Sequence, residues 1–277
     1  GAVVAQGQVE VEQNRQIVQH PDGGVVAEIA VKDGDSVAAG DLLIRLDGDL
    51  LRSERAIVES QLYELIARRG RLEAERAEAS EITFAADLVA AAAKDPEIAQ
   101  LMDGQTALFD ARRITLDKSL QQLVERRAQT EKQIEGVDAQ LTSLSTQVDL
   151  IRKELTDQKK LLERGLAQAS RVLALEREEA ALSGQIGELT ASRAQSQGRL
   201  TEIEIEVLRL QSQRREEAET ELRNTGYREL ELAERRRSLT GQIERLEIRA
   251  PVAGTVHAMT VTTPRSVIRA VIGSGVI

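Results

Sequence analysis

The sequence predicts a mostly α-helical protein in which a long antiparallel coiled-coil hairpin of three helices interrupts a small β-domain. Three observations support this fold class. Aromatic residues make up only 1% of the chain and charged residues 30%, which is typical of coiled coils rather than of large globular cores. Apolar residues follow 3-4 spacing through the middle of the chain. A short β-like sequence occurs twice, once near each end.

Composition excludes several classes of partner and site. The net charge is −9, whereas nucleic-acid binding needs a basic surface. The chain has two Phe, two Tyr and no Trp, so it lacks the rings on which bases stack. Cys is absent, which excludes disulfides, thiolate metal sites and a cysteine nucleophile. No run of eighteen apolar residues occurs, so we expect no transmembrane helix in this chain.

Motifs for catalysis, cofactors or metals are missing from the sequence. No Gly-rich phosphate loop occurs, so ATP hydrolysis is not expected. The two histidines, His20 and His257, are not at motif spacing, and we expect them to be solvated residues at strand edges. The many Glu pairs have helical spacing, which indicates exposed ion-paired faces. We therefore expect a protein that is not an enzyme, with no cofactor and no metal.

The first element in chain order is a β-like segment from Val18 to Val37, within residues 1–47. It reads as two short strands, and Asp33-Gly34 between them is a strong signal for a tight turn. By Leu50 the pattern has become helical. A few short strands alone are not stable in water, so this segment needs a partner.

The partner is predicted at the other end of the chain, in residues 250–277. Residues 249–267 match the first segment at a constant offset, because both read Pro-x-x-Gly, then alternating apolar residues, then a turn, then Ser-Val. Two such copies can bury their apolar faces against each other. We therefore expect one β-sandwich made of two halves, which residues 48–249 leave and rejoin at one point.

The inserted residues 48–249 are predicted to form a helical hairpin. Apolar residues keep 3-4 spacing from Leu116 to Leu162 and again from Leu182 to Leu246, with a slip of about one residue between Leu210 and Leu222, and this spacing favours a coiled coil. Some seam positions are polar, and they either face each other in one polar layer or lie partly exposed along a thin hairpin. These residues are Arg127, Thr130, Arg193 and Ser196.

The ends of the helices follow from glycine, proline and capping residues. Pro96 and Gly104 lie in a less periodic joint, residues 81–104, and Pro breaks a helix interior. Gly165 is a good C-terminal stop, and Ser170 is a candidate N-cap for the next helix. The sequence thus predicts helices at about 51–79, 105–164 and 170–247, with the tip of the hairpin at about 165–169.

The repeated segment resembles a known fold. Pro-x-x-Gly-x-Val, followed by Val-x-x-Gly-Asp-x-Val and Gly-Asp-x-Leu, is similar to the lipoyl/biotinyl carrier domains. Those carriers bear a modified lysine in the hairpin between their halves, but Leu46 to Leu50 of this chain contains no lysine. A carrier function is therefore not expected. It would be supported if the measured mass of the intact native protein included an added lipoyl or biotin group.

A lipoyl-like domain split by a helical hairpin resembles the membrane fusion proteins, which are periplasmic adaptors of bacterial exporters. The segments Arg-Leu-Glu-Ala-Glu-Arg at 71–76 and Ala-Leu-Phe-Asp-Ala-Arg at 107–112 are similar to segments of the haemolysin-D type, the adaptors of type I secretion systems. The resemblance covers nearly the whole chain, and its specific part is the split repeat.

The resemblance implies a function and a location. Such adaptors link an inner-membrane ABC transporter to an outer-membrane duct of the TolC type and assemble into a ring, six copies in the family. They lie in the periplasm and are anchored by an N-terminal helix, which we expect to precede this chain. Adaptor tips dock on the duct, and the matching candidates here are Leu162, Gly165, Leu166 and Ser170, with Arg164 or Arg171 as the basic member.

Two other functions remain open at this point. The chain could be an adaptor of a multidrug efflux pump, although those hairpins usually consist of two simple helices without a joint such as residues 81–104. It could also be a coiled-coil scaffold with a degenerate carrier domain. The leucines around the tip, which include Leu161 and Leu173, would then only close the core of the hairpin.

Overall fold

A computed structural model describes residues 16–269 of the 277-residue chain. The chain divides into two compact units, Gly1–Ile66 with Thr225–Ile277, and Ala67–Asn224. Two helices are continuous across this division, so the units do not coincide with the expected boundaries after residues 47 and 249. No helix in the described part of the chain is long and apolar enough to cross a membrane.

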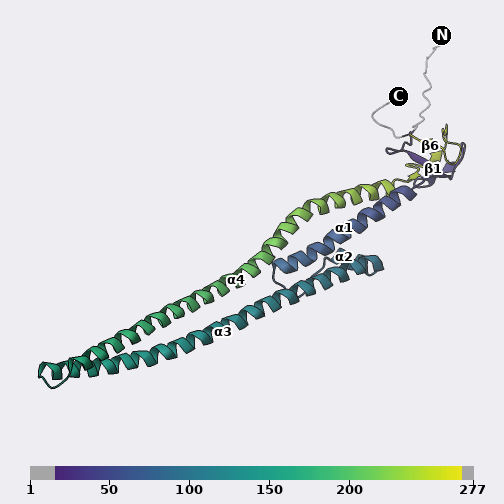
Figure 1. The fold of residues 1–277 in the computed structure, drawn as a ribbon. Helices are drawn as coiled ribbons and strands as arrows, with labels where there is room; N and C mark the ends of the chain where they lie inside the picture. Colours follow the sequence, from purple (N-terminus) through teal and green to yellow (C-terminus); the bar gives the residue numbers. More distant parts are fainter. Residues whose placement is uncertain (1–15, 270–277) are drawn as a thin grey trace, which may run out of the picture. The chain divides into compact units, whose positions relative to one another are not determined.

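The β-strands come from both ends of the chain and pair with one another (Figure 1). One sheet has the order β4-β3-β1-β6 and the other the order β2-β5. In each sheet a strand of the first sequence copy lies antiparallel to a strand of the second copy, β1 with β6 and β2 with β5. The strands are β1 Gly24–Ile29, β2 Ser36–Val37, β3 Leu42–Leu46, β4 Glu247–Arg249, β5 Gly254–Thr255 and β6 Val267–Ile268.

A small apolar core holds these strands to the ends of two helices. Val26, Leu46 and Leu246 are buried at its centre, and Ile44 and Ile243 pack against them. The backbone N–H of Leu46 donates to the carbonyl of Leu246 at 2.9 Å, so the chain leaves and rejoins the β-domain at adjacent positions. The two halves of the split domain thus meet as the repeat predicts.

The first helix, α1 (Asp49–Arg76), packs within its own unit against the last part of α4 (Ala169–Glu244). Val58 and Leu62 are buried on α1, and Leu232 and Leu239 are buried on α4. Their 3-4 spacing turns one narrow apolar stripe of each helix toward the core. The remaining faces carry ion pairs and are exposed.

The joint between α1 and the long helix differs from the expectation. A short helix, α2 (Ala86–Ala92), lies in it, so the described chain contains four helices rather than three. The long helix α3 runs from Pro96 to Glu163 and starts well before residue 105. Asp95 caps it by accepting from the N–H of Glu97 at 2.9 Å. Pro96 begins this helix instead of breaking it, because the first turn needs no N–H donor there.

Helices α3 and α4 run antiparallel through the second unit (Figure 1). Arg127 pairs with Glu204 at 3.8 Å, and Asp138 pairs with Arg193 at 2.7 Å. Eleven residues along α3 therefore correspond to eleven residues back along α4, which fixes the register. This constant step is the expected geometry of an antiparallel coiled coil.

Of the two arrangements left open for the polar seam residues, the single polar layer is wrong, and partial exposure holds for the two arginines. Thr130 and Ser196 are buried, but Arg127 and Arg193 are about half exposed and pair with acidic residues at the two different levels just described. Thr130 also satisfies its own hydroxyl, which donates to the carbonyl of Arg126 at 2.9 Å. The polar seam residues therefore lie at separate levels along the hairpin. The long arginine side chains extend from the seam to the solvent-exposed edge of the helix pair.

Candidate functional site

The tip of the hairpin is a tight turn closed by backbone hydrogen bonds. After α3 ends at Glu163, the N–H of Leu166 donates to the carbonyl of Leu161 and the N–H of Gly165 to that of Leu162, both at 2.9 Å. Gly165 has a φ of 75°, a left-handed conformation that costs Gly little. These two bonds and the left-handed residue form a Schellman motif, which satisfies the last carbonyls of α3.

The outgoing helix begins one residue earlier than expected. α4 starts at Ala169, and the N–H of Arg171 donates to the carbonyl of Gln168 at 3.0 Å. Ser170 therefore lies in the first turn and not at the N-cap.

Part of the leucine cluster closes the core of the hairpin. Leu155, Val172 and Leu175 are buried together near the tip, and Leu162 packs against them. Leu162 thus has a structural role whether or not it also contacts a partner.

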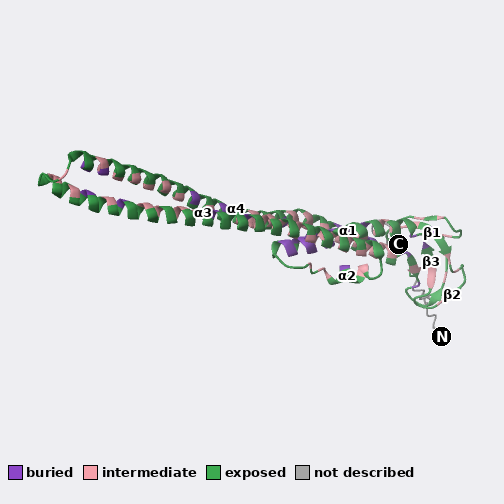
Figure 2. Cartoon of the chain, turned by 60° about the horizontal axis from the view of Figure 1, so that its bottom comes forward, coloured by how far each residue is buried: buried purple, intermediate pink, exposed green. Residues whose placement is uncertain are grey.

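The remaining tip residues are exposed. Leu166 is 73% exposed and Leu173 is 54% exposed, although both are large and apolar. Figure 2 shows mostly exposed residues along the ribbon at the end of the hairpin. Arg164, Ser170 and Arg171 are among the exposed residues, and Arg171 forms an ion pair with Glu154. The turn between the end of α3 and the start of α4 therefore presents apolar and basic groups close together.

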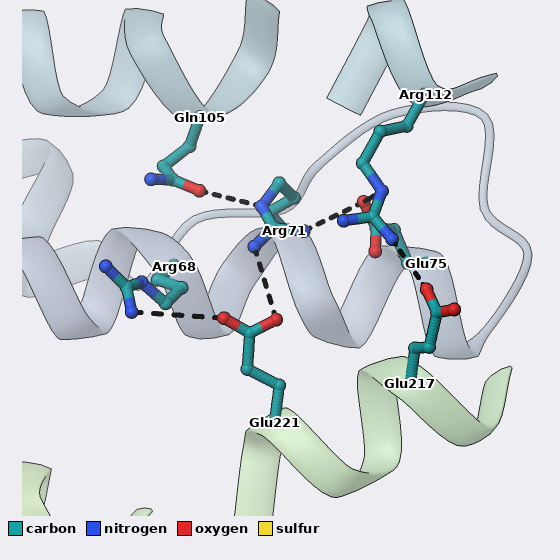
Figure 3. Close-up of polar contacts among 7 residues, drawn as sticks. All are labelled: Arg68, Arg71, Glu75, Gln105, Arg112, Glu217 and Glu221. Atoms are coloured by element: carbon teal, nitrogen blue, oxygen red, sulfur yellow. Dashed lines mark hydrogen bonds and ion pairs between the residues drawn. The ribbon is translucent and has the colours of Figure 1, made fainter. Parts of the chain in front are cut away.

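A buried ionic cluster lies at the other end of the same unit (Figure 3). Glu75 is 1% exposed, and its Oε1 accepts from Nη1 of Arg71 at 2.9 Å and lies 3.4 Å from Nε of Arg112. Arg71 also donates from Nε to Gln105 at 2.8 Å, and Nη2 lies 3.9 Å from Glu221. The cluster joins α1 to both α3 and α4.

Sequence reasoning missed this cluster, although it singled out two segments that contain three of its residues. Arg71 and Glu75 lie in the segment at 71–76, and Arg112 lies in the segment at 107–112. Their spacing within one helix is that of an ordinary exposed ion pair, so the spacing alone gives no sign of burial. A search for charged residues on the apolar stripe of α1, beside buried Leu72, would have found it.

The close packing of the return loop explains the burial. A Cβ at Gly70 would lie 3.1 Å from Cδ1 of Phe84 and 3.3 Å from Cγ2 of Ile82. The loop after α1 therefore folds back over the helix at this glycine. Together with buried Phe109 on α3, it removes the neighbouring charges from water.

The expectation for His20 is wrong. Its side chain is buried at 4% exposure, and Nε2 donates to the carbonyl of Arg245 at 2.9 Å. Arg245 in turn donates to Asp22 through Nε and Nη2 at 2.9 and 2.7 Å. His20 thus fixes the segment before β1 to the end of α4, whereas His257 is exposed as expected. Over residues 16–269, no three His, Cys, Asp or Glu side chains are placed to hold a metal ion.

Comparison with known proteins identifies the family. A family model described as AprE, the long α-helical hairpin, matches residues 51–242. The chain is 40% identical over 267 residues to the type I secretion system membrane fusion protein PrsE of Rhizobium meliloti, covering 96% of this chain and 61% of PrsE. It is 27% identical over 260 residues to the alkaline protease secretion protein AprE of Pseudomonas aeruginosa, covering 94% and 60%. The chain thus spans about three fifths of the length of these relatives.

Solved structures agree with this result. The soluble domain of LipC, a membrane fusion protein of a type I secretion system, matches with a TM-score of 0.88 at 28% identity, over 93% of this chain and 96% of that one. The periplasmic adaptor protein EmrA matches with a TM-score of 0.52 at 18% identity, over 92% and 68%, which shows a shared fold alone. The chain therefore belongs to the AprE family of long α-helical hairpins, among the membrane fusion proteins of type I secretion systems.

Proposed function

We propose that this chain is the hairpin-bearing part of a periplasmic adaptor that links an inner-membrane ABC transporter to a TolC-type outer-membrane duct for protein secretion. The observation that carries the proposal is the tip. A long hairpin of this family ends in a tight turn, where Leu166 is 73% exposed, and Leu173 at the start of α4 is 54% exposed. A partner that covers Leu166 and Leu173 would remove this apolar surface from water, which supports docking at the tip.

Each contact between a tip and the duct would be weak, and several copies together would bind strongly. Full burial of one Leu side chain contributes about 1.5 to 3 kcal/mol, so Leu166 and Leu173 together supply a few kcal/mol per copy before the cost of association. A ring of copies on one duct makes later contacts effectively intramolecular. Six copies are expected from the family. Arg164 and Arg171 would add charge-assisted hydrogen bonds to carboxylates or carbonyls of the duct.

The adaptor works as a scaffold and not as an enzyme. The lipoyl-like domain and the tip of the hairpin would each contact a different partner, and the whole protein would be anchored in the inner membrane. A joint with an extra helix, α2, supports type I secretion over a multidrug efflux adaptor with two simple helices. A coiled-coil scaffold with a degenerate carrier domain predicts no contact between the tip and a duct.

Cross-linking from the tip tests the proposal, because the chain contains no Cys. A single Cys is placed at exposed Ser170 in the full-length protein, which is expressed in its host and treated with a thiol cross-linker. We expect an adduct with the outer-membrane duct. Cys at Ser60, which is also exposed but lies in α1, is the matched control and should give none. If neither Ser170 nor Leu166 gives an adduct in cells that actively secrete, the scaffold function is favoured instead.

A further inference from the structure

The helix pair of the first unit, α1 and the last part of α4, carries exposed apolar residues on both outer edges. On α1, Leu50 and Ile57 are one heptad apart, and exposed Ser53 and Ser60 continue the same 3-4 spacing. Ser60 follows buried Val58 of the seam by two residues, so it lies on the opposite side of the helix from the seam. α1 therefore carries a second stripe on the side away from α4.

The outer edge of α4 carries a matching stripe. Tyr227 and Leu230 are three residues apart, and exposed Glu234 and Arg237 extend the 3-4 spacing. Glu234 follows buried Leu232 of the seam by two residues, so this stripe lies on the side away from α1. Large apolar side chains are thus in solvent on two opposite edges. Their exposed fractions are 81% for Leu50, 60% for Ile57, 80% for Tyr227 and 69% for Leu230.

The two stripes lie at similar heights on the helix pair. Glu54 of α1 forms an ion pair with Arg235 of α4, which sets residue 54 opposite residue 235. Because the helices are antiparallel, residue 59, five positions later on α1, lies opposite Leu230, five positions earlier on α4. Ile57 and Leu230 are therefore two residues, or about 3 Å, apart along the helix axis. A second copy at the same height would place its Leu230 beside Ile57.

Charged residues at one end of the two stripes are complementary. Asp49 begins α1 with a side chain that is 91% exposed, and the side chain of Arg237 on α4 is 77% exposed. By the same register Arg237 lies opposite residue 52, about 4.5 Å from Asp49 along the axis. Each is in an ion pair within its own helix, with Arg52 and Glu234 respectively, and exposed pairs of this kind exchange partners at little cost. Arg237 of one copy would thus pair with Asp49 of the next.

We propose that the α4 edge of one copy packs on the α1 edge of a second copy of this chain. The inference rests on the proposed function, in which several copies stand side by side around one duct. The contact joins two different surfaces, so every copy offers one of each, and rotation about an axis parallel to the helices closes a ring. Leu230 would lie between Ile57 and Ser60 of the next copy, where the small serine side chain leaves room for Tyr227.

Disulfide cross-linking between copies tests this contact, because the chain contains no Cys. Ser53→Cys and Glu234→Cys are placed in two differently tagged copies of the full-length protein, which are expressed together in the host. Both positions are exposed, and both substitutions leave the apolar residues in place. Under mild oxidation we expect a disulfide between the two copies and none from either variant alone. Ser143→Cys, at an exposed position on α3, replaces Ser53→Cys as the control for random collisions and should give none.

Substitution of the apolar residues tests their part in the contact. Leu230→Gln or Ile57→Gln should slow formation of this disulfide about five- to tenfold, because each removes a large apolar side chain from the interface. Leu208→Gln is the matched control, since it removes a similarly exposed leucine from α4 in the second unit and should leave the rate unchanged. Equal rates for all three variants would overturn the proposal.

The tip experiment in the same cells separates this inference from the proposed function. An adduct between the duct and Cys at Ser170, without a disulfide between copies, would overturn the contact and leave the adaptor function standing. Loss of both products would count against both. A disulfide from Ser53→Cys alone or Glu234→Cys alone would show contact between identical edges, which also overturns the proposal. A chain that carries both Cys residues should give a ladder of linked copies, and a ladder that stops at two copies would contradict a ring.

Discussion

Removing the central carboxylate of the ionic cluster should destabilise the second unit strongly. In Glu75→Ala, the buried Arg71 guanidinium loses its acceptor at 2.9 Å but keeps Gln105 at 2.8 Å and Glu221 at 3.9 Å. Breaking a buried ion pair from one side costs about 3 to 5 kcal/mol. Because Arg71 keeps these two contacts, we expect a loss at the lower end of that range, about 3 kcal/mol in the free energy of unfolding.

Urea denaturation followed by circular dichroism at 222 nm measures this loss. With a slope of about 2 kcal/mol per molar urea, the midpoint of the transition should fall by about 1.5 M. Glu219→Ala is the matched control, because it breaks an ion pair with Arg76 in which both side chains are half exposed. That loss should stay below about 1 kcal/mol. A midpoint for Glu75→Ala within about 0.3 M of the control would refute the claim that burial makes this cluster strong.

Replacing all three charged residues tests whether folding requires the buried ion pairs, or only requires that no buried charge loses its partner. In the triple variant Arg71→Met, Glu75→Leu and Arg112→Met, no charge of the triad is left without its partner inside the protein. Apolar replacements of buried ionic triads are often neutral or stabilising. We therefore expect the triple variant to regain most of the stability that Glu75→Ala loses, with the same denaturation assay as the measurement.

Three further predictions concern backbone and charge. Gly70→Ala should be less stable than Gly184→Ala by about 1 to 2 kcal/mol in urea, because a Cβ at 70 meets a ring carbon at 3.1 Å and one at 184 meets nothing within 4 Å. Gly165→Ala places a side chain at a φ of 75°, so it should cost about 1 kcal/mol and speed amide exchange at the tip. A hydrogen bond from Arg249 lowers the pKa of Glu247, so this carboxylate stabilises the folded state above the ordinary glutamate pKa and loses that effect as the pH falls through its lowered value. Unfolding of Glu247→Gln in urea between pH 3 and 6 should therefore be less pH-dependent than that of the parent chain.

The sequence predicted the architecture because its signals are periodic or repeated. The 3-4 spacing specified the hairpin, and the repeated Pro-x-x-Gly segment specified a β-domain in two halves, whose strands do pair across the ends of the chain. The fold class and the family resemblance are both confirmed. The tip contacts with a duct remain a prediction.

The errors came from features that depend on distant contacts. Pro96 in a less periodic joint predicts a broken helix, but proline is also a preferred first residue of a helix, and the capping Asp95 before it marks a helix start here. Burial of Glu75 depends on a loop that returns over Gly70, which local spacing cannot show. Burial of His20 likewise depends on Arg245, which lies 225 residues further along the chain.

The interleaved strands of the β-domain also constrain the order of folding. β2 pairs with β5, so this small sheet cannot form until more than two hundred intervening residues have been synthesised. Closing a flexible loop of about 200 residues costs about 3 kcal/mol more than closing one of about 10. A hairpin that folds first on its local contacts would bring the two halves together and remove most of that cost. The β-domain therefore forms only after the helical insert is complete. An unfinished or broken hairpin would leave the two halves of the β-domain apart and unpaired.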